Sequence, residues 1–179
     1  TAYGGYGVNM TPGFRAATRV LVEQGFVWAQ VNIRGGGEFG EEWHRQGNLT
    51  NKQNVFDDFA AACKYMVDAK YTTPAKLVIE GGSNGGLLMG AALTQHPDLF
   101  KAVVSHVGIY DMLRVELSSN GAFNIPEFGT VTDEAQFKAL HAYSPYQHVK
   151  DGTKYPGVLF LTGANDPRVI PVESEEIVA

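Results

Sequence analysis

The sequence predicts an α/β fold, in which helices flank a mostly parallel sheet. Predicted helices and strands alternate along the chain, with a long excursion before the last strand, and this order is typical of an open parallel sheet. The predicted strands are nearly continuous apolar runs, as expected for strands that are buried on both faces. The chain has 179 residues, of which 44% are hydrophobic and 18% are charged, a balance that fits one globular domain.

The first predicted elements are a helix over residues 12–24 and a strand over residues 25–33. A proline suits the first helical turn, and Gly25 ends the helix. The apolar residues of this helix share one face: Phe14, Ala17 and Leu21. The strand segment, GFVWAQVNI, is rich in β-branched and aromatic residues, so we expect a strand that is buried on both faces.

The clearest helical pattern covers residues 52–70. Its apolar residues recur every three or four positions along one stripe: Val55, Phe56, Phe59, Ala60, Cys63, Met66 and Val67. A short apolar run over residues 77–80 predicts the next strand, and a helix from Gly86 to near Pro97 follows it.

Two further apolar runs predict strands over residues 102–107 and 158–162. The excursion between them, residues 108–156, is too long for an ordinary connection, and we expect it to mix short helices with a functional loop. The last nine residues, PVESEEIVA, are typical of the first turns of a helix.

Composition excludes several classes of protein and site. Fourteen basic and nineteen acidic residues give a net charge of −5 without a basic run, which argues against nucleic acid as a partner. No stretch approaches the roughly 20 apolar residues of a membrane span, and residues 1–20 lack the pattern of a signal peptide. Cys63 is the single cysteine, so we expect no internal disulfide, and no cluster of cysteines and histidines has the spacing of a zinc site. We expect neither a metal nor a cofactor. Localisation stays open.

The segment GGSNGG carries the most chemical information, because Gly81, Ser83 and Gly85 form G-x-S-x-G between a predicted strand and a predicted helix. A strand that turns sharply into a helix strains the serine backbone, and flanking glycines let neighbouring segments approach. The N–H of Asn84 then faces the oxyanion that forms when the serine attacks a carbonyl. The pattern predicts a nucleophilic serine; the alternative is a glycine-rich turn without a catalytic role.

Asp166 is the candidate for a carboxylate that orients a catalytic base. It follows the strand over residues 158–162, at the sheet edge where Ser83 lies, and serine before aspartate is the order found in α/β-hydrolases. The alternative is an aspartate that starts a turn before proline. The base itself should be a histidine after Asp166, but all five histidines precede it: His44, His96, His106, His141 and His148. We therefore expect the chain to be a segment of a longer protein.

A second glycine pattern, G-x-G-x-x-G at Gly35, Gly37 and Gly40, resembles a dinucleotide-binding fingerprint. Glu41 and Glu42 follow it directly and would repel a pyrophosphate, and no apolar helix comes next. We therefore expect a glycine-rich surface loop.

Taken together, the motifs resemble the catalytic domain of the prolyl oligopeptidase family of serine peptidases. The resemblance rests on blocks in matching order: YGGYG at 3–7, NIRGGGEFGEEWH at 32–44, NKQNVFDDF at 51–59, GGSNGGLL at 81–88, HPDLF at 96–100, VGIYDML at 107–113, YSPY at 143–146 and NDPRV at 165–169. It implies one partial α/β-hydrolase domain over residues 1–179, incomplete at both ends, without the family's β-propeller domain and without the C-terminal segment that carries the triad histidine.

The resemblance also implies roles for individual residues. Ser83 matches the nucleophile and Asp166 the triad aspartate, while Tyr3 joins the N–H of Asn84 in the oxyanion hole. Arg168 matches an arginine that binds a carbonyl of the substrate backbone. Four further residues match positions that line the specificity pocket, although ordinary apolar packing is the alternative for each: Tyr6, Ile109, Phe128 and Val169.

One departure from the family bears on specificity. Prolyl-specific members stack a tryptophan on the substrate proline, and the matching position here is Asn124. Neighbouring Phe123 is a possible substitute, so proline preference stays open. The expected activity is hydrolysis of short peptides through an acyl-enzyme. The alternatives are an esterase and a non-catalytic binding or assembly module. We expect the isolated chain to be inactive and prone to self-association, because it lacks the base and parts of the sheet.

Overall fold

The computed structural model describes residues 1–178 of the chain. Its first half contains α1 (Ala16–Glu23), α2 (Glu41–Arg45), α3 (Gln53–Asp68), β1 (Val78–Gly82) and α4 (Asn84–Gln95). Its second half contains β2 (Ala102–His106), α5 (Gly121–Phe128), α6 (Glu134–Tyr143), β3 (Gly157–Leu161) and α7 (Val172–Glu176). Four short 3-10 turns join them: Leu49–Asn51, Pro97–Leu99, Val115–Leu117 and Tyr146–His148. The predicted alternation of helices and strands is thus confirmed from β1 onward.

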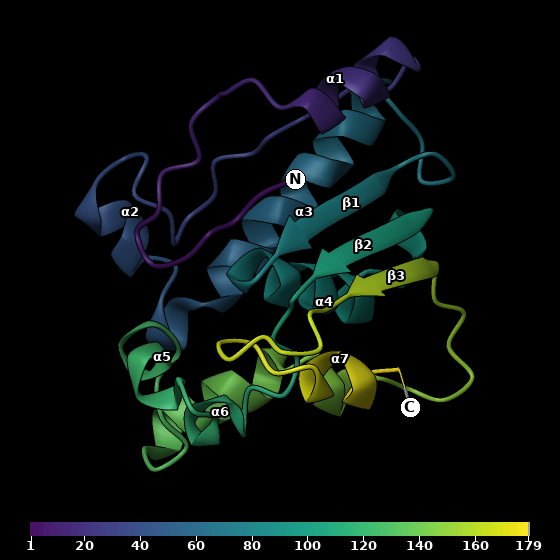
Figure 1. Cartoon of the computed structure of the whole chain (residues 1–179). Helices are drawn as coiled ribbons and strands as arrows, with labels where there is room; N and C mark the ends of the chain where they lie inside the picture. Colours follow the sequence, from purple (N-terminus) through teal and green to yellow (C-terminus); the bar gives the residue numbers. More distant parts are fainter. Residues whose placement is uncertain (179) are drawn as a thin grey trace.

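The sheet consists of three parallel strands in the order β1-β2-β3, whose arrows point the same way in Figure 1. Their register places Gly81, Ser105 and Phe160 side by side. Because all strands are parallel, the loops that follow them leave from one edge of the sheet. That edge carries both Ser83 and Asp166, which follow β1 and β3.

Helix α4 covers one face of the sheet and lies behind the strands in Figure 1, and α3 packs against α4. Nearly every residue of α4 is buried, and Ile79 and Val103 meet it from the strands. The apolar stripe predicted for residues 52–70 faces this core along most of its length, with five members buried: Val55, Phe56, Phe59, Ala60 and Cys63. Burial of this kind supplies most of the free energy that holds a fold together.

The opposite face of the sheet carries no covering helix among the described residues. Val78, Leu159 and Leu161 point to this face and are 42%, 52% and 42% exposed. The expectation that the strand over residues 158–162 is buried on both faces is therefore wrong. The strand forms as β3, but it lies at the edge of the sheet, and only α4's side is covered.

The predicted strand over residues 25–33 is also wrong. This segment is extended, and two backbone hydrogen bonds join it to Thr1: Thr1 N donates to Ala29 O at 2.8 Å, and Val31 N donates to Thr1 O at 3.0 Å. No strand in residues 1–178 pairs with it. The residues favour a strand, but a strand also needs a neighbour that completes its hydrogen-bond ladder.

The first predicted helix forms as α1, but it is shorter than the predicted range of residues 12–24 and has no buried residue. Phe14, which was expected on its apolar face, lies before the helix and is 81% exposed. The excursion over residues 108–156 does mix short helices with loops, as predicted. Within the described range, the helices are too short or too polar to cross a bilayer.

Candidate active site

Ser83 occupies a strained turn between β1 and α4. Its φ of 57° and ψ of −122° lie in a region that residues with a side chain rarely adopt. Hydrogen bonds fix this conformation on both sides: Ser83 N donates to His106 O at 2.9 Å, and Ser83 O accepts from Gly86 N at 2.8 Å. The sharp strand-to-helix turn that the glycine pattern predicts is therefore present.

The two glycines of the pattern make room for the turn. A Cβ at Gly81 would lie 2.4 Å from Gly85 O, and a Cβ at Gly85 would lie 3.0 Å from Ala2 O. The first contact shows that β1 and α4 approach too closely for any side chain. The second shows that the N-terminal segment passes directly over the start of α4, which brings Tyr3 to Ser83.

The Tyr3 phenol lies beside the Ser83 hydroxyl. Burial raises the pKa of the Tyr3 phenol, and the interaction with Ser83 and the positive charge of Arg168 partly oppose that rise. The net rise keeps the phenol protonated at neutral pH, so that it can donate a hydrogen bond. Nearby, the backbone N–H of Asn84 belongs to the first turn of α4, whose N–H groups have no acceptor within the helix.

The side chain of Asn84 forms a contact that the sequence did not indicate. It is buried, and its Nδ2 donates to Tyr3 O at 2.6 Å. The first residue of α4 therefore holds the N-terminal segment in place through its side chain, while its backbone N–H stays available beside Ser83.

Asp166 lies in the turn after β3 and is partly exposed. Its Oδ1 accepts hydrogen bonds from Arg168 N at 2.8 Å and Val169 N at 3.2 Å. These bonds lower the pKa of the Asp166 carboxyl, which is therefore ionised at neutral pH. The turn anticipated for an aspartate before proline is present, and it fixes the direction of the carboxylate. Three histidines are paired with other groups: His44 with Glu127, His106 with Glu80, and His148 with Ser144.

A small hollow of about 10 Å³, roughly the room of one water molecule, lies close to this turn. Its lining comes from the excursion, the Asp166 turn and α7: Ile109, Val115, Ser118, Asn124, Arg168, Val169, Ile170 and Glu173. The fold thus brings together Ile109, Arg168 and Val169, three of the residues expected to bind substrate.

Tyr6 and Phe128, the other two expected pocket residues, do not line this hollow. Phe128 is fully buried, and its ring packs edge-on against Tyr6 at a centroid distance of 5.7 Å. Tyr6 OH donates to Asn124 Oδ1 at 2.7 Å, so the residue at the tryptophan position is buried and holds Tyr6. Phe123 stacks on the ring of Tyr6 and is 66% exposed.

Sequence reasoning missed a buried group of charges beneath the N-terminal segment. Lys52 Nζ lies 2.8 Å from Glu127 Oε1, and His44 Nε2 lies 2.8 Å from Glu127 Oε2. One signal could have revealed Lys52: it precedes Val55 and Phe56 by three and four positions, and so belongs to the buried stripe of the helix. Glu127 and His44 carried no comparable signal.

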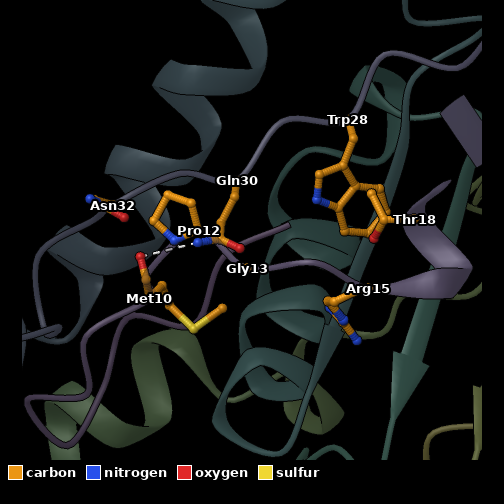
Figure 2. A pocket seen from close by; sticks show the side chains of 8 residues that line it. All are labelled: Met10, Pro12, Gly13, Arg15, Thr18, Trp28, Gln30 and Asn32. Carbon is orange, nitrogen blue, oxygen red and sulfur yellow. Dashed lines mark hydrogen bonds between the residues drawn. The ribbon is translucent and has the colours of Figure 1, made fainter.

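A larger hollow of about 260 Å³ lies elsewhere, between residues 10–18 and the extended segment 28–32 (Figure 2). Gln30 Nε2 donates to Met10 O across it at 3.1 Å. Its lining is as follows: Met10, Pro12, Gly13, Arg15, Thr18, Trp28, Gln30 and Asn32. No predicted site residue belongs to it, so size does not identify the site. Groups of three or more side chains suited to bind a metal do not occur within residues 1–178.

Comparison with known proteins identifies the family. A family model described as "Prolyl oligopeptidase family" matches residues 12–179. The chain is 42% identical to the prolyl endopeptidase of Dictyostelium discoideum over 181 residues, covering 100% of this chain and 24% of that protein. It is 41% identical to the prolyl endopeptidase of Elizabethkingia meningoseptica, covering 97% of this chain and 25% of that protein.

Solved structures agree. The chain superposes on a prolyl endopeptidase with a TM-score of 0.97 and 50% identity, covering 99% of this chain and 26% of that one. For prolyl oligopeptidase B from Galerina marginata the TM-score is 0.96 and the identity 35%, with 99% of this chain and 26% of that one covered. The chain spans about a quarter of the length of these relatives, and the predicted α/β-hydrolase fold is confirmed. The chain belongs to the prolyl oligopeptidase family.

Proposed function

We propose that the chain is a segment of the catalytic domain of a longer serine peptidase, which hydrolyses short peptides through an acyl-enzyme at Ser83. One observation carries this proposal: Ser83 adopts a strained strand-to-helix turn beside the Tyr3 phenol. Stored strain of this kind is typical of functional sites, where the surrounding structure holds a reactive side chain in one direction. Two relatives of the chain are prolyl endopeptidases, which supports peptides as substrates.

In the proposed reaction, Ser83 Oγ attacks the carbonyl carbon of the scissile peptide bond. Tyr3 OH and Asn84 N–H donate hydrogen bonds to the oxyanion that forms. A histidine from outside this chain accepts the serine proton and delivers it to the leaving amine, while Asp166 orients that histidine. Water then hydrolyses the acyl-enzyme by the same route. The reaction requires no cofactor.

Substrate binding is proposed on the surface around the hollow beside Arg168, because the hollow itself has room for only about one water molecule. The apolar side chains there, Ile109 and Val169, suit the side chain that precedes the scissile bond, and the Arg168 guanidinium suits a backbone carbonyl. Asn124 lines the hollow at the position where prolyl-specific members of the family have an aromatic ring that stacks on proline. Strict preference for proline is therefore no part of this proposal.

Arg168 separates the peptidase from its closest alternative, an esterase for small acyl esters. In the full-length protein, Arg168→Ala is expected to lower kcat/KM for peptides about 10- to 100-fold, because a charge-assisted hydrogen bond is lost. Hydrolysis of a small ester, which has no backbone to bind, should change less than about threefold. Arg19→Ala, which removes an exposed arginine on α1, is the matched control. Equal losses on both substrates, or a wild-type protein that cleaves no peptide, would contradict the proposal.

For the isolated segment we propose negligible turnover together with self-association. Loss of a triad base costs a serine protease about a millionfold in kcat, and the uncovered sheet face exposes Val78, Leu159 and Leu161. Purified residues 1–179 should react very slowly with a fluorophosphonate probe and should elute as oligomers in size-exclusion chromatography. Rapid, stoichiometric labelling of Ser83 would refute the need for an external base, and a monomer with a sharp thermal transition would refute self-association.

A further inference from the structure

A buried ion pair lies below the segment that carries Tyr3. Lys52 is fully buried at the start of α3, Glu127 is 3% exposed in α5, and their charged atoms are 2.8 Å apart. Removing two charges from water costs several kcal/mol for each ion, so a fold does not gain stability from such a pair by default. Its position therefore calls for a reason other than packing.

The pair has two further partners. Lys52 Nζ donates to Gly4 O at 3.2 Å, and Glu127 Oε2 is bound by His44 Nε2 at 2.8 Å. One ammonium and one carboxylate thus connect the N-terminal segment, α2, the start of α3 and the end of α5. Burial lowers the pKa of Lys52, while the Glu127 carboxylate opposes that shift and favours the charged amine.

The contact with Gly4 acts on a backbone that is otherwise hard to hold. Gly4 and Tyr6 both have positive φ angles, 65° and 55°, so the segment turns tightly between Tyr3 and Tyr6. Among residues 1–178, two side chains donate hydrogen bonds to the carbonyls of this segment: Asn84 to Tyr3 O, and Lys52 to Gly4 O. These two bonds fix the backbone on both sides of the Tyr3–Gly4 peptide bond, and the position of that backbone sets the position of the Tyr3 phenol.

The same ion pair also reaches the pocket side. Glu127 is the neighbour of Phe128, whose ring packs against Tyr6, and Lys52 Nζ lies 5.1 Å from the centre of that ring. The turn that presents Tyr3 to Ser83 is therefore fixed at two points: Lys52 binds the carbonyl of Gly4, and Phe128 packs against the ring of Tyr6.

We propose that Lys52, held by Glu127, is a positioning residue that sets the Tyr3 hydroxyl against Ser83. The inference rests on the function proposed above, in which Tyr3 stabilises the oxyanion. Its consequence is specific: loss of the ion pair should weaken stabilisation of the transition state more than binding of the substrate. A displacement of about 1 Å in such a donor can cost about 100-fold in rate.

The test is a double-mutant cycle in the full-length protein between Lys52→Met and Tyr3→Phe. Lys52→Met keeps the length and apolar stem of the side chain and removes the ammonium. Alone, it should lower kcat for a peptide about 10- to 100-fold, with KM changed less than about threefold. In the Tyr3→Phe background the same substitution should cost less than about threefold, because the donor it positions is already gone. Lys64→Met, on the exposed side of α3, is the matched control and should leave kcat unchanged.

Each other outcome overturns a defined statement. Equal losses in kcat in both backgrounds would show that Lys52 acts through general stability, and would overturn the positioning role while the proposed function stands. A Tyr3→Phe variant with wild-type kcat would overturn both the oxyanion role and the positioning role. If Lys52→Met fails to fold, Glu127→Gln in the same cycle gives the same decision, since it removes the charge that holds Lys52. Lys52→Arg, which restores a charged donor, should recover part of the lost kcat.

Discussion

Replacing Ser83 with alanine in the full-length protein is expected to lower kcat for peptide hydrolysis by about a millionfold. The oxyanion donors stabilise only the oxyanion that attack on a carbonyl forms, and Asp166 only orients the base that takes the proton from Oγ, so neither replaces the missing nucleophile. The fold should survive. Alanine has the same Cβ as serine, so the cost of the positive φ at this position does not change.

The measurement pairs kcat for a chromogenic peptide with the thermal unfolding temperature. Ser119→Ala is the matched control, because Ser119 is an exposed serine near the Asp166 turn whose Oγ donates to Pro167 O at 3.0 Å. Its loss should leave kcat within about twofold, as is usual for an exposed hydrogen bond. Residual activity above about 1% in Ser83→Ala, after exclusion of contaminating wild-type enzyme, would show that another group is the nucleophile.

The turn at Ser83 could be predicted from sequence because its determinants are local. An apolar run, a serine between glycines and a helical run follow one another directly, and they predict a strand, a tight turn and a helix in that order. The close approach of Gly81 to Gly85 O is the structural form of that pattern. The position of Asp166 after a strand was equally accessible, since parallel strands bring their following loops to one edge.

The strands were harder to predict, since strand formation depends on residues far away in the chain. Residues 25–33 have the composition of a buried strand, but they find no strand partner within the described range and remain extended. Leu159 and Leu161 belong to a real strand and are nevertheless exposed, because nothing in residues 1–178 covers that face. Composition reports what a segment favours, whereas burial depends on what packs against it.

The ion pair below Tyr3 lay beyond sequence reasoning for the same reason. Lys52 and Glu127 are 75 residues apart, and the contact depends on how α5 packs beside the start of α3. A charged residue within an apolar stripe signals that a partner exists, but it does not say which acidic residue that partner is.

Asp166→Asn is expected to lower kcat for peptides about ten-thousandfold in the full-length protein. Asparagine keeps the shape of the side chain, and its amide oxygen can still accept from Arg168 N and Val169 N, as Oδ1 does now. The turn, and with it the position of Arg168, should therefore persist. What disappears is the negative charge, which the lowered pKa of Asp166 maintains at neutral pH.

This separation of charge from geometry makes the substitution decisive. The base that Asp166 orients needs an acceptor for its ring N–H, and an asparagine can present an NH₂ group there instead, which favours the wrong tautomer. KM should stay within about threefold, because Arg168 and the hollow are retained. Asp151→Asn, an exposed aspartate in the turn before β3, controls for loss of a surface charge. If Asp166→Asn kept wild-type kcat while Asp166→Ala lost it, Asp166 would serve only to build the turn, and the orienting carboxylate would have to be another residue.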